Sequence, residues 1–168
     1  YLIYAWVVED SLLLREGELW VSVHSKDGTQ LFRNLLSSHA HKPRLFEHTT
    51  DSKVVLWWVD GTAAPYSLKY ATLDTFGFPT SFNAPVTFVV TGISFERRFD
   101  ACVGDSGISW VAYWNGTNVL VKRLNAIFGV TQTITIAESG ETAVGIYFDG
   151  TNIAVGWSNT TPTTRGAI

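Results

Sequence analysis

The sequence predicts an all-β chain built from repeated four-stranded units, and three observations support this prediction. Helical periodicity is nearly absent, and short apolar segments rich in Val, Ile, Thr, Trp, Tyr and Phe alternate with Gly, Asn, Asp and Pro. Asn115-Gly116 lies between two such segments, which is a strong β-hairpin signal. Finally, Asp-Ser occurs at residues 10, 51 and 105, and Asp149-Gly150 follows, at spacings of 41, 54 and 44 residues.

The repeat divides the chain into four successive units, with approximate bounds 1–40, 41–92, 93–138 and an incomplete 139–168. In each unit one strand precedes the Asp turn and further strands follow it. The predicted strands are Leu2–Val8, Leu12–Leu14, Leu19–His24, Gln30–Leu35, Arg44–His48, Val54–Val59, Tyr66–Leu73, Pro85–Val90, Phe99–Val103, Ile108–Trp114, Val119–Leu124, Thr131–Ile136, Ala143–Phe148 and Ile153–Trp157. Leu31–Ala40 is a helical candidate, but it lacks an N-cap and reads equally well as a strand followed by a loop.

Units of about 40–50 residues with four strands each are typical of β-propeller blades. Blades stack face to face, so both faces of an inner strand are buried. Val54–Val59 and Ile108–Trp114 are apolar on both faces, whereas a one-sided sandwich would be polar on the second face. We therefore expect a single β-propeller segment of about three and a half antiparallel blades, part of a larger ring or of a ring that copies of the chain complete.

Composition excludes several functions. The chain has 168 residues, of which 46% are hydrophobic and 16% charged. Its formal net charge of −3 provides no excess of positive charge to attract the phosphate backbone, which argues against nucleic-acid binding. No apolar run approaches the ~18 residues of a membrane helix. The chain contains no Met and begins at Tyr1, so we expect a fragment of a longer protein.

One segment resembles a known motif. Residues 25–32, SKDGTQLF, resemble the Asp-box (Ser-x-Asp-x-Gly-x-Thr-Trp) of sialidase-type propellers, with Gly one residue early and Phe in place of Trp. The segment lies between the third and fourth predicted strands, where that family places it. The resemblance implies a propeller fold and keeps a sialidase-like carbohydrate-active enzyme open as an alternative function.

The candidate binding residues lie in a long loop and in a charge cluster. Phe76, Phe78 and Phe82 occupy the connection 74–84, where they would bind a glycan or a protein, or simply cover the blade edge. Arg97 and Arg98 lie next to Glu96 and Asp100. Because adjacent strand residues point to opposite faces, the two arginines cannot converge on one substrate carboxylate, and an ion-paired edge strand is the simpler interpretation.

Other polar residues have simpler structural explanations. Asp10, Asp51, Asp105 and Asp149 would accept hydrogen bonds from their own turns, or serve as ligands of a cation. The spacing of His39, His41 and His48 would suit a metal, but solvated loop histidines explain it better. Cys102 lies in an apolar strand and is expected to be a buried, reduced thiol.

We therefore predict a structural or binding propeller module with no enzymatic function, no catalytic residues, no metal and no cofactor. The composition resembles that of virion components such as phage tail propellers, which suggests a virion or extracellular location. The expected partners are protein subunits or a host glycan. Two alternatives stay open: a fragment of a sialidase-like enzyme, and a half-propeller that homo-oligomerises to complete its ring.

Overall fold

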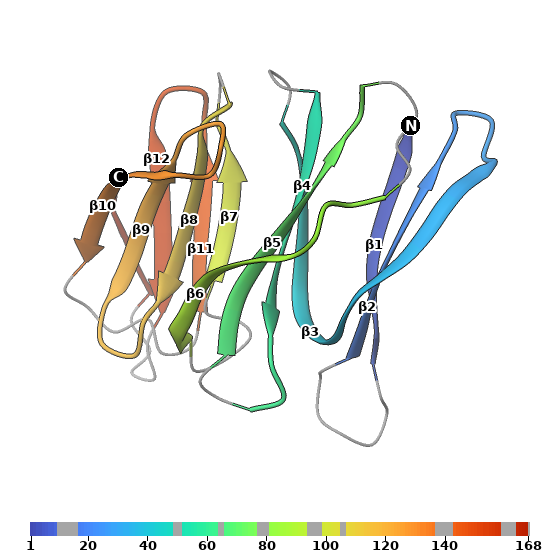
Figure 1. Ribbon diagram of the computed structural model, residues 1–168. Coiled ribbons are helices and arrows are strands. Elements are labelled where there is room, and N and C mark those ends of the chain that lie inside the picture. The colour runs from blue at the N-terminus through green and yellow to red at the C-terminus, as the bar shows by residue number, and fades with distance from the viewer. Residues whose placement is uncertain are drawn as a thin grey trace. The chain divides into compact units, whose positions relative to one another are not determined.

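The computed structural model describes residues 1–9, 17–48, 52–63, 66–76, 81–93, 99–104, 107–136, 143–158 and 164–167. These residues form antiparallel strands in three sheets (Figure 1). The chain divides into two compact units, the first of residues 1–48 and 52–90 and the second running from Thr91 onward. The predicted all-β fold class is confirmed.

One sheet belongs to the first unit except for the end of β6 after Val90, and strands that are neighbours in the chain are neighbours in this sheet. Its strands, in sheet order, are β1 (Leu2–Glu9), β2 (Gly17–His24), β3 (Gln30–His48), β4 (Lys53–Asp60), β5 (Tyr66–Asp74) and β6 (Val86–Ile93). β3 has 19 residues and takes part in two ladders, its first half with β2 and its second half with β4. β3 changes its pairing partner at Ala40, which is opposite Gly17 in the β2 ladder and opposite Asp60 in the β4 ladder.

β3 bends within its length, and the strands on either side of the bend pack against a shared core. The β3–β4 register shifts between His41 and Arg44, and Lys42, just before Pro43, has a positive φ of 47°. The two halves bury a shared cluster. Its buried members are Leu19, Val21, Val23, Ala40, Val54, Leu56, Trp58, Ala71, Leu73 and Phe82.

β4 is buried on both faces, as predicted. Residues 54 to 59 are all buried, and Trp57 and Trp58, which point to opposite faces, have no exposed surface. Trp58 belongs to the shared core, while Trp57 packs against Tyr70 and Phe88, with ring centroids 4.9 and 5.3 Å away. Two-sided burial distinguishes this strand from one in a half-solvated sheet.

The second unit contains two sheets. One has the order β10-β9-β8-β7, and the other β11-β12-β13. Their bounds are β7 (Phe99–Val103), β8 (Ser109–Trp114), β9 (Val119–Leu124), β10 (Val130–Ile136), β11 (Ala143–Phe148), β12 (Ile153–Ser158) and β13 (Thr164–Ala167). Ala112, Val119 and Val121 of the first sheet form one buried cluster with residues of the second, among them Val144, Val155 and Trp157.

Two expectations concern the first strands. β1 pairs with β2 along its whole length, from Leu2 opposite His24 to Glu9 opposite Gly17. The predicted strand Leu12–Leu14 lies outside the described part of the chain and stays a prediction. The helical candidate Leu31–Ala40 is strand throughout, because it continues the long β3.

Within the described ranges, no helix has the length and apolar character needed to cross a membrane.

Candidate functional site

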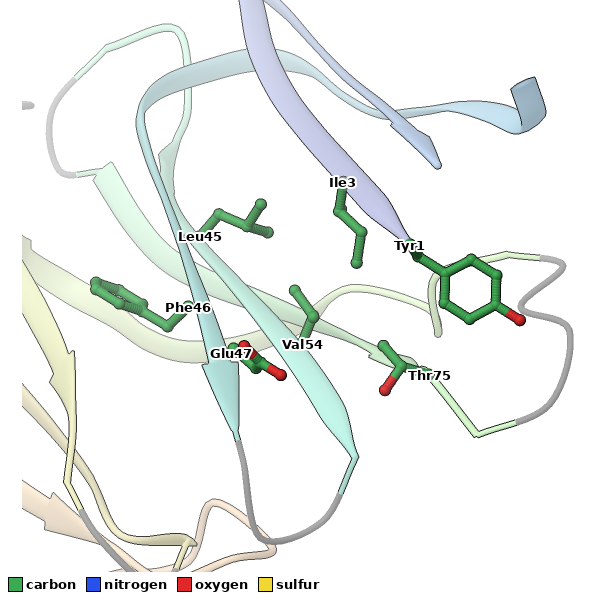
Figure 2. Close-up of a pocket in the computed structure, with 7 residues that line it drawn as sticks. All are labelled: Tyr1, Ile3, Leu45, Phe46, Glu47, Val54 and Thr75. Carbon is green, nitrogen blue, oxygen red and sulfur yellow. The ribbon is translucent and has the colours of Figure 1, made fainter. Parts of the chain in front are cut away.

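The candidate site is a pocket in the first unit, between β1 and the β3–β4 pair (Figure 2). Its volume is about 340 Å³, within the range of small-molecule sites. The lining residues are Tyr1, Ile3, Leu45, Phe46, Glu47, Val54 and Thr75. Figure 2 shows Ile3, Leu45 and Val54 pointing into the same space, so three strands supply an apolar floor.

Strand geometry places a carboxylate beside this floor. Leu45 and Glu47 are two residues apart on β3, so their side chains leave the same face of the strand. Glu47 faces Val54 across the ladder, and its side chain is exposed whereas Val54 is buried. An acidic group in solvent therefore lies next to an apolar surface.

A hydroxyl group lies at the same end of the strands. The backbone N–H and the Oγ1 of Thr75 both donate to the carbonyl of Ser52, each at 2.7 Å. These two bonds fix Thr75, which follows β5, against the turn before β4. The Oγ1 atom keeps lone pairs with which it can accept a hydrogen bond from a ligand.

This arrangement is suited to binding more than to catalysis by itself. Apolar surface, an aromatic ring, a carboxylate and a hydroxyl are the groups that hold a molecule with both C–H and O–H surfaces. Glycoside hydrolysis ordinarily uses two carboxyl groups, and Glu47 is the single one among the described lining residues. A second carboxyl group would have to come from elsewhere in the protein.

A second polar cluster joins three strands at the other end of β4. Asp60 accepts hydrogen bonds from Lys69 Nζ at 2.6 Å, from Trp58 Nε1 at 3.2 Å, and from the Ser37 hydroxyl. Partial burial by itself would raise the pKa of Asp60. The bonds from Lys69, Ser37 and Trp58, together with the Lys69 charge, outweigh burial and lower the pKa below its ordinary value. The ionised Asp60 carboxylate therefore links β3, β4 and β5 through its hydrogen bonds.

The predicted binding loop is only partly described, and its two described phenylalanines differ. Phe76 is 90% exposed, whereas Phe82 is 6% exposed and packs in the core of the first unit. Phe82 is therefore not available to a ligand on the surface. Phe78, Arg97 and Arg98 lie outside the described residues, as does Glu96, so their binding role stays a prediction.

The histidines differ from the predicted solvated loop residues. All three lie in β3, and His39 is exposed, but His41 and His48 are 3% and 1% exposed. The prediction is wrong for these two because β3 continues through the expected loop. The His41 ring bonds the Gly61 carbonyl at 3.1 Å. Among the described residues, no three His, Cys, Asp or Glu side chains gather as a metal site would require.

Turn carboxylates behave as the simpler interpretation predicted where they are described. Asp149 Oδ1 accepts from the backbone N–H groups of Asn152 at 2.7 Å and Thr151 at 2.8 Å, and these bonds lower the pKa of Asp149. Asn115 Oδ1 accepts equivalent bonds from Thr117 and Asn118. Asp10, Asp51 and Asp105 lie outside the described residues.

The Asp-box segment forms a tight turn between β2 and β3. Asp27 Oδ1 accepts from the Ser25 hydroxyl and, at 3.0 Å, from Thr29 N, while Gly28 has a positive φ of 90°. These bonds lower the pKa of Asp27, with the Ser25 bond contributing most. They give the segment a local structural role, and the family resemblance stays a prediction.

Cys102 was predicted to be a buried, reduced thiol, and in the structure it is only partly buried. It lies in β7, half-buried against the core of the second unit. Burial, with a smaller contribution from the Asp100 charge, raises the pKa of the Cys102 thiol to about 12. The thiol is therefore protonated at neutral pH and is a poor nucleophile.

Sequence reasoning did not find the pocket. Its residues come from four segments and share no motif. The alternation of Leu45, Phe46 and Glu47 in the predicted strand Arg44–His48 was the local signal, and by itself it does not distinguish a pocket from an ordinary half-buried strand.

No protein-family model matches the chain, and no curated protein matches it. Two solved structures are similar. Both are of an exo-β-1,3-galactanase from Phanerochaete chrysosporium. The structure with galactose has a TM-score of 0.59 at 16% identity and covers 95% of this chain and 42% of that chain. The structure of a variant with β-1,3-galactotriose has a TM-score of 0.56 at 18% identity, with the same coverage.

This likeness shows the fold: an all-β chain of propeller-type antiparallel sheets. The chain spans less than half the length of the chains that it matches.

The likeness also corrects one prediction. We predicted a chain with no enzymatic function, and the similar structures are of an enzyme. The prediction failed because it relied on finding no catalytic set in the sequence, and residues far apart in the chain leave no local motif. Neither of the two similar structures supports the predicted virion or phage tail component, and this part of the prediction stays untested.

Proposed function

We propose that this chain is part of a carbohydrate-active β-propeller enzyme and that its pocket holds part of a glycan. The observation that carries the proposal is the likeness to two galactanase structures over 95% of the chain. It supports the carbohydrate-active alternative over the structural module. Because the identity to these structures is only 16–18%, the kind of sugar and the linkage that the pocket would bind are also part of the proposal.

The pocket has the chemistry that such a ligand requires. A pyranose ring presents C–H groups on its faces and hydroxyl groups around its edge. Ile3 and Leu45, which are only partly buried, would contact the C–H surface above the buried Val54, and Glu47 would accept hydrogen bonds from hydroxyl groups. Because Glu47 is charged, its bonds are stronger than those between neutral partners.

Calorimetric titration of the chain with galactose and β-1,3-galactotriose tests the proposal, with xylotriose and cellotriose as competing sugars. We expect β-1,3-galactotriose to bind, and Glu47→Gln to weaken binding roughly 10- to 100-fold, since a hydrogen bond to a charged group contributes about 1.5–3 kcal/mol. Glu18→Gln is the matched control, because it makes the same change on an exposed residue of β2 that does not line the pocket.

A folded chain that binds none of these sugars, in a titration and on a broad glycan array, would contradict the proposal. Release of galactose from β-1,3-galactan would extend it from binding to catalysis.

We also propose that the predicted units 1–40, 41–92, 93–138 and 139–168 are the blades. Ala40, where β3 changes partner from β2 to β4, supports the first boundary.

A further inference from the structure

β1 forms an edge of the six-stranded sheet and lacks the protection that several other edge strands have. In the described part of the chain, its ladder partner is β2, with no register shift over eight residues. A regular edge strand presents a row of N–H and C=O groups to a further strand. The segment LIYAWVVE has no Lys, Pro or bulge, and its single charge is Glu9 at the end.

Three other edge strands in the described part of the chain are less open to pairing. β10 carries Thr and Gln residues and a register shift near Val130, and β13 has four residues, one of them Arg165. In β11, the N–H of Ile146 donates to the Asp100 carboxylate at 3.3 Å, so a side chain occupies that position. Natural edge strands use such devices to avoid pairing. β1 has none of these devices, so its edge is open to a further strand.

The side chains of β1 are also suited to a partner. Ile3, Ala5 and Val7 point into the core, while the opposite face carries Leu2, Tyr4, Trp6 and Val8. Leu2, Tyr4 and Val8 are 45%, 52% and 48% exposed. An apolar row on an edge strand gains most when an equally apolar strand lies alongside it.

We propose that two copies of this chain associate through antiparallel pairing of β1 with β1 of the second copy. The strand is self-complementary in this direction, since the apolar rows meet and the two Glu9 residues lie at opposite ends. Parallel pairing would place the two Glu9 charges side by side. A two-fold interface of this kind uses the same surface on both copies and closes as a dimer.

Sedimentation of the whole chain over a concentration series tests the proposal. We expect a monomer–dimer equilibrium, and Tyr4→Lys should raise the dissociation constant at least tenfold, because a charged side chain at the seam opposes pairing. Leu35→Lys is the matched control, since Leu35 is 43% exposed on β3, where it is not at this edge. Val8→Lys repeats the test at a second edge position, and circular dichroism confirms that each variant folds.

Hydrogen exchange supplies a direct readout: the β1 amides should gain protection as the dimer forms. A monomer at all concentrations, open-ended aggregation in place of a dimer, or a dimer that responds equally to Tyr4→Lys and Leu35→Lys would each overturn the proposal. None of these results depends on glycan binding.

Discussion

Some contacts between individual residues cannot be predicted from their order in the chain. Ser37, Asp60 and Lys69 belong to three different strands, and no spacing in the sequence predicts that they meet. Lys69 is nine residues from Asp60, and their contact depends on the β4–β5 register. By contrast, the bonds that Asp149 and Asn115 make to their own turns were predictable, because they need only the local Asx-Gly-Thr-Asn sequence.

Asp60→Asn should lower the free energy of unfolding by about 1–3 kcal/mol at neutral pH, because it removes a charged acceptor from a partly buried cluster. The pKa of Asp60 is lowered in the folded state, so its contribution is present above the unfolded pKa and is lost as pH falls through the folded value. Urea denaturation at neutral pH and near pH ~3 checks both points. Asp74→Asn, at an exposed carboxylate, is the control and should have little effect.

Cys102 should react slowly with a thiol reagent in the folded chain. A rise in pKa from 9.0 to about 12 lowers the thiolate fraction at neutral pH roughly 1000-fold. The rate of alkylation, measured by mass spectrometry with and without urea, should rise sharply on unfolding. Fast alkylation of the native chain would show that β7 is more open than described.

At the scale of elements, the sequence predicted strands well wherever apolar pattern and turn chemistry agreed. Phe99–Val103 and Ala143–Phe148 match β7 and β11 at both ends, and Val119–Leu124 matches β9. The pattern failed at β3, because one strand there joins two ladders and a bulge resets which side chains face inward. A bend of this kind depends on tertiary packing and leaves no strong local signal.

Gly17 should be essential to the β1–β2 pair. A Cβ at this position would lie 2.1 Å from the carbonyl oxygen of Val8, a backbone atom that can move only with β1. Gly17→Ala should therefore cost about 1–3 kcal/mol. Gly156→Ala is the strand control, because nothing lies within 4 Å of its added methyl group. Thermal denaturation of the two variants should give a clearly lower midpoint for Gly17→Ala alone.

The two faces of β4 should both contribute to stability. Leu56→Ala, on the face of the shared core, should cost about 2–5 kcal/mol, and Val55→Ala, on the opposite face, about 1–3 kcal/mol. Thr133→Ala, at an exposed position of β10, is the control. Chemical denaturation measures all three. A negligible cost for Val55→Ala would mean that this face is not packed, contrary to the blade interpretation.

At the scale of the whole molecule, fold and function were unequally predictable. Repeat spacing and two-faced strands were enough to predict propeller-type sheets, because these depend on periodicity. The pocket was not predictable, since Ile3, Glu47 and Thr75 come together only when β1, β3 and β5 are in place. The absence of a recognisable catalytic set in the sequence does not exclude an enzyme, because catalytic residues that are far apart in the chain leave no local motif.

The central claim, that the pocket between β1 and the β3–β4 pair holds a sugar, is tested most directly by NMR of the methyl-labelled chain titrated with β-1,3-galactotriose. We predict saturable shifts of the Ile3, Leu45 and Val54 methyl signals, while Val121 and Val155 of the second unit stay unchanged. Glu47→Gln should reduce these shifts at equal sugar concentration. Unchanged pocket signals at saturating sugar, or shifts confined to the second unit, would contradict the claim.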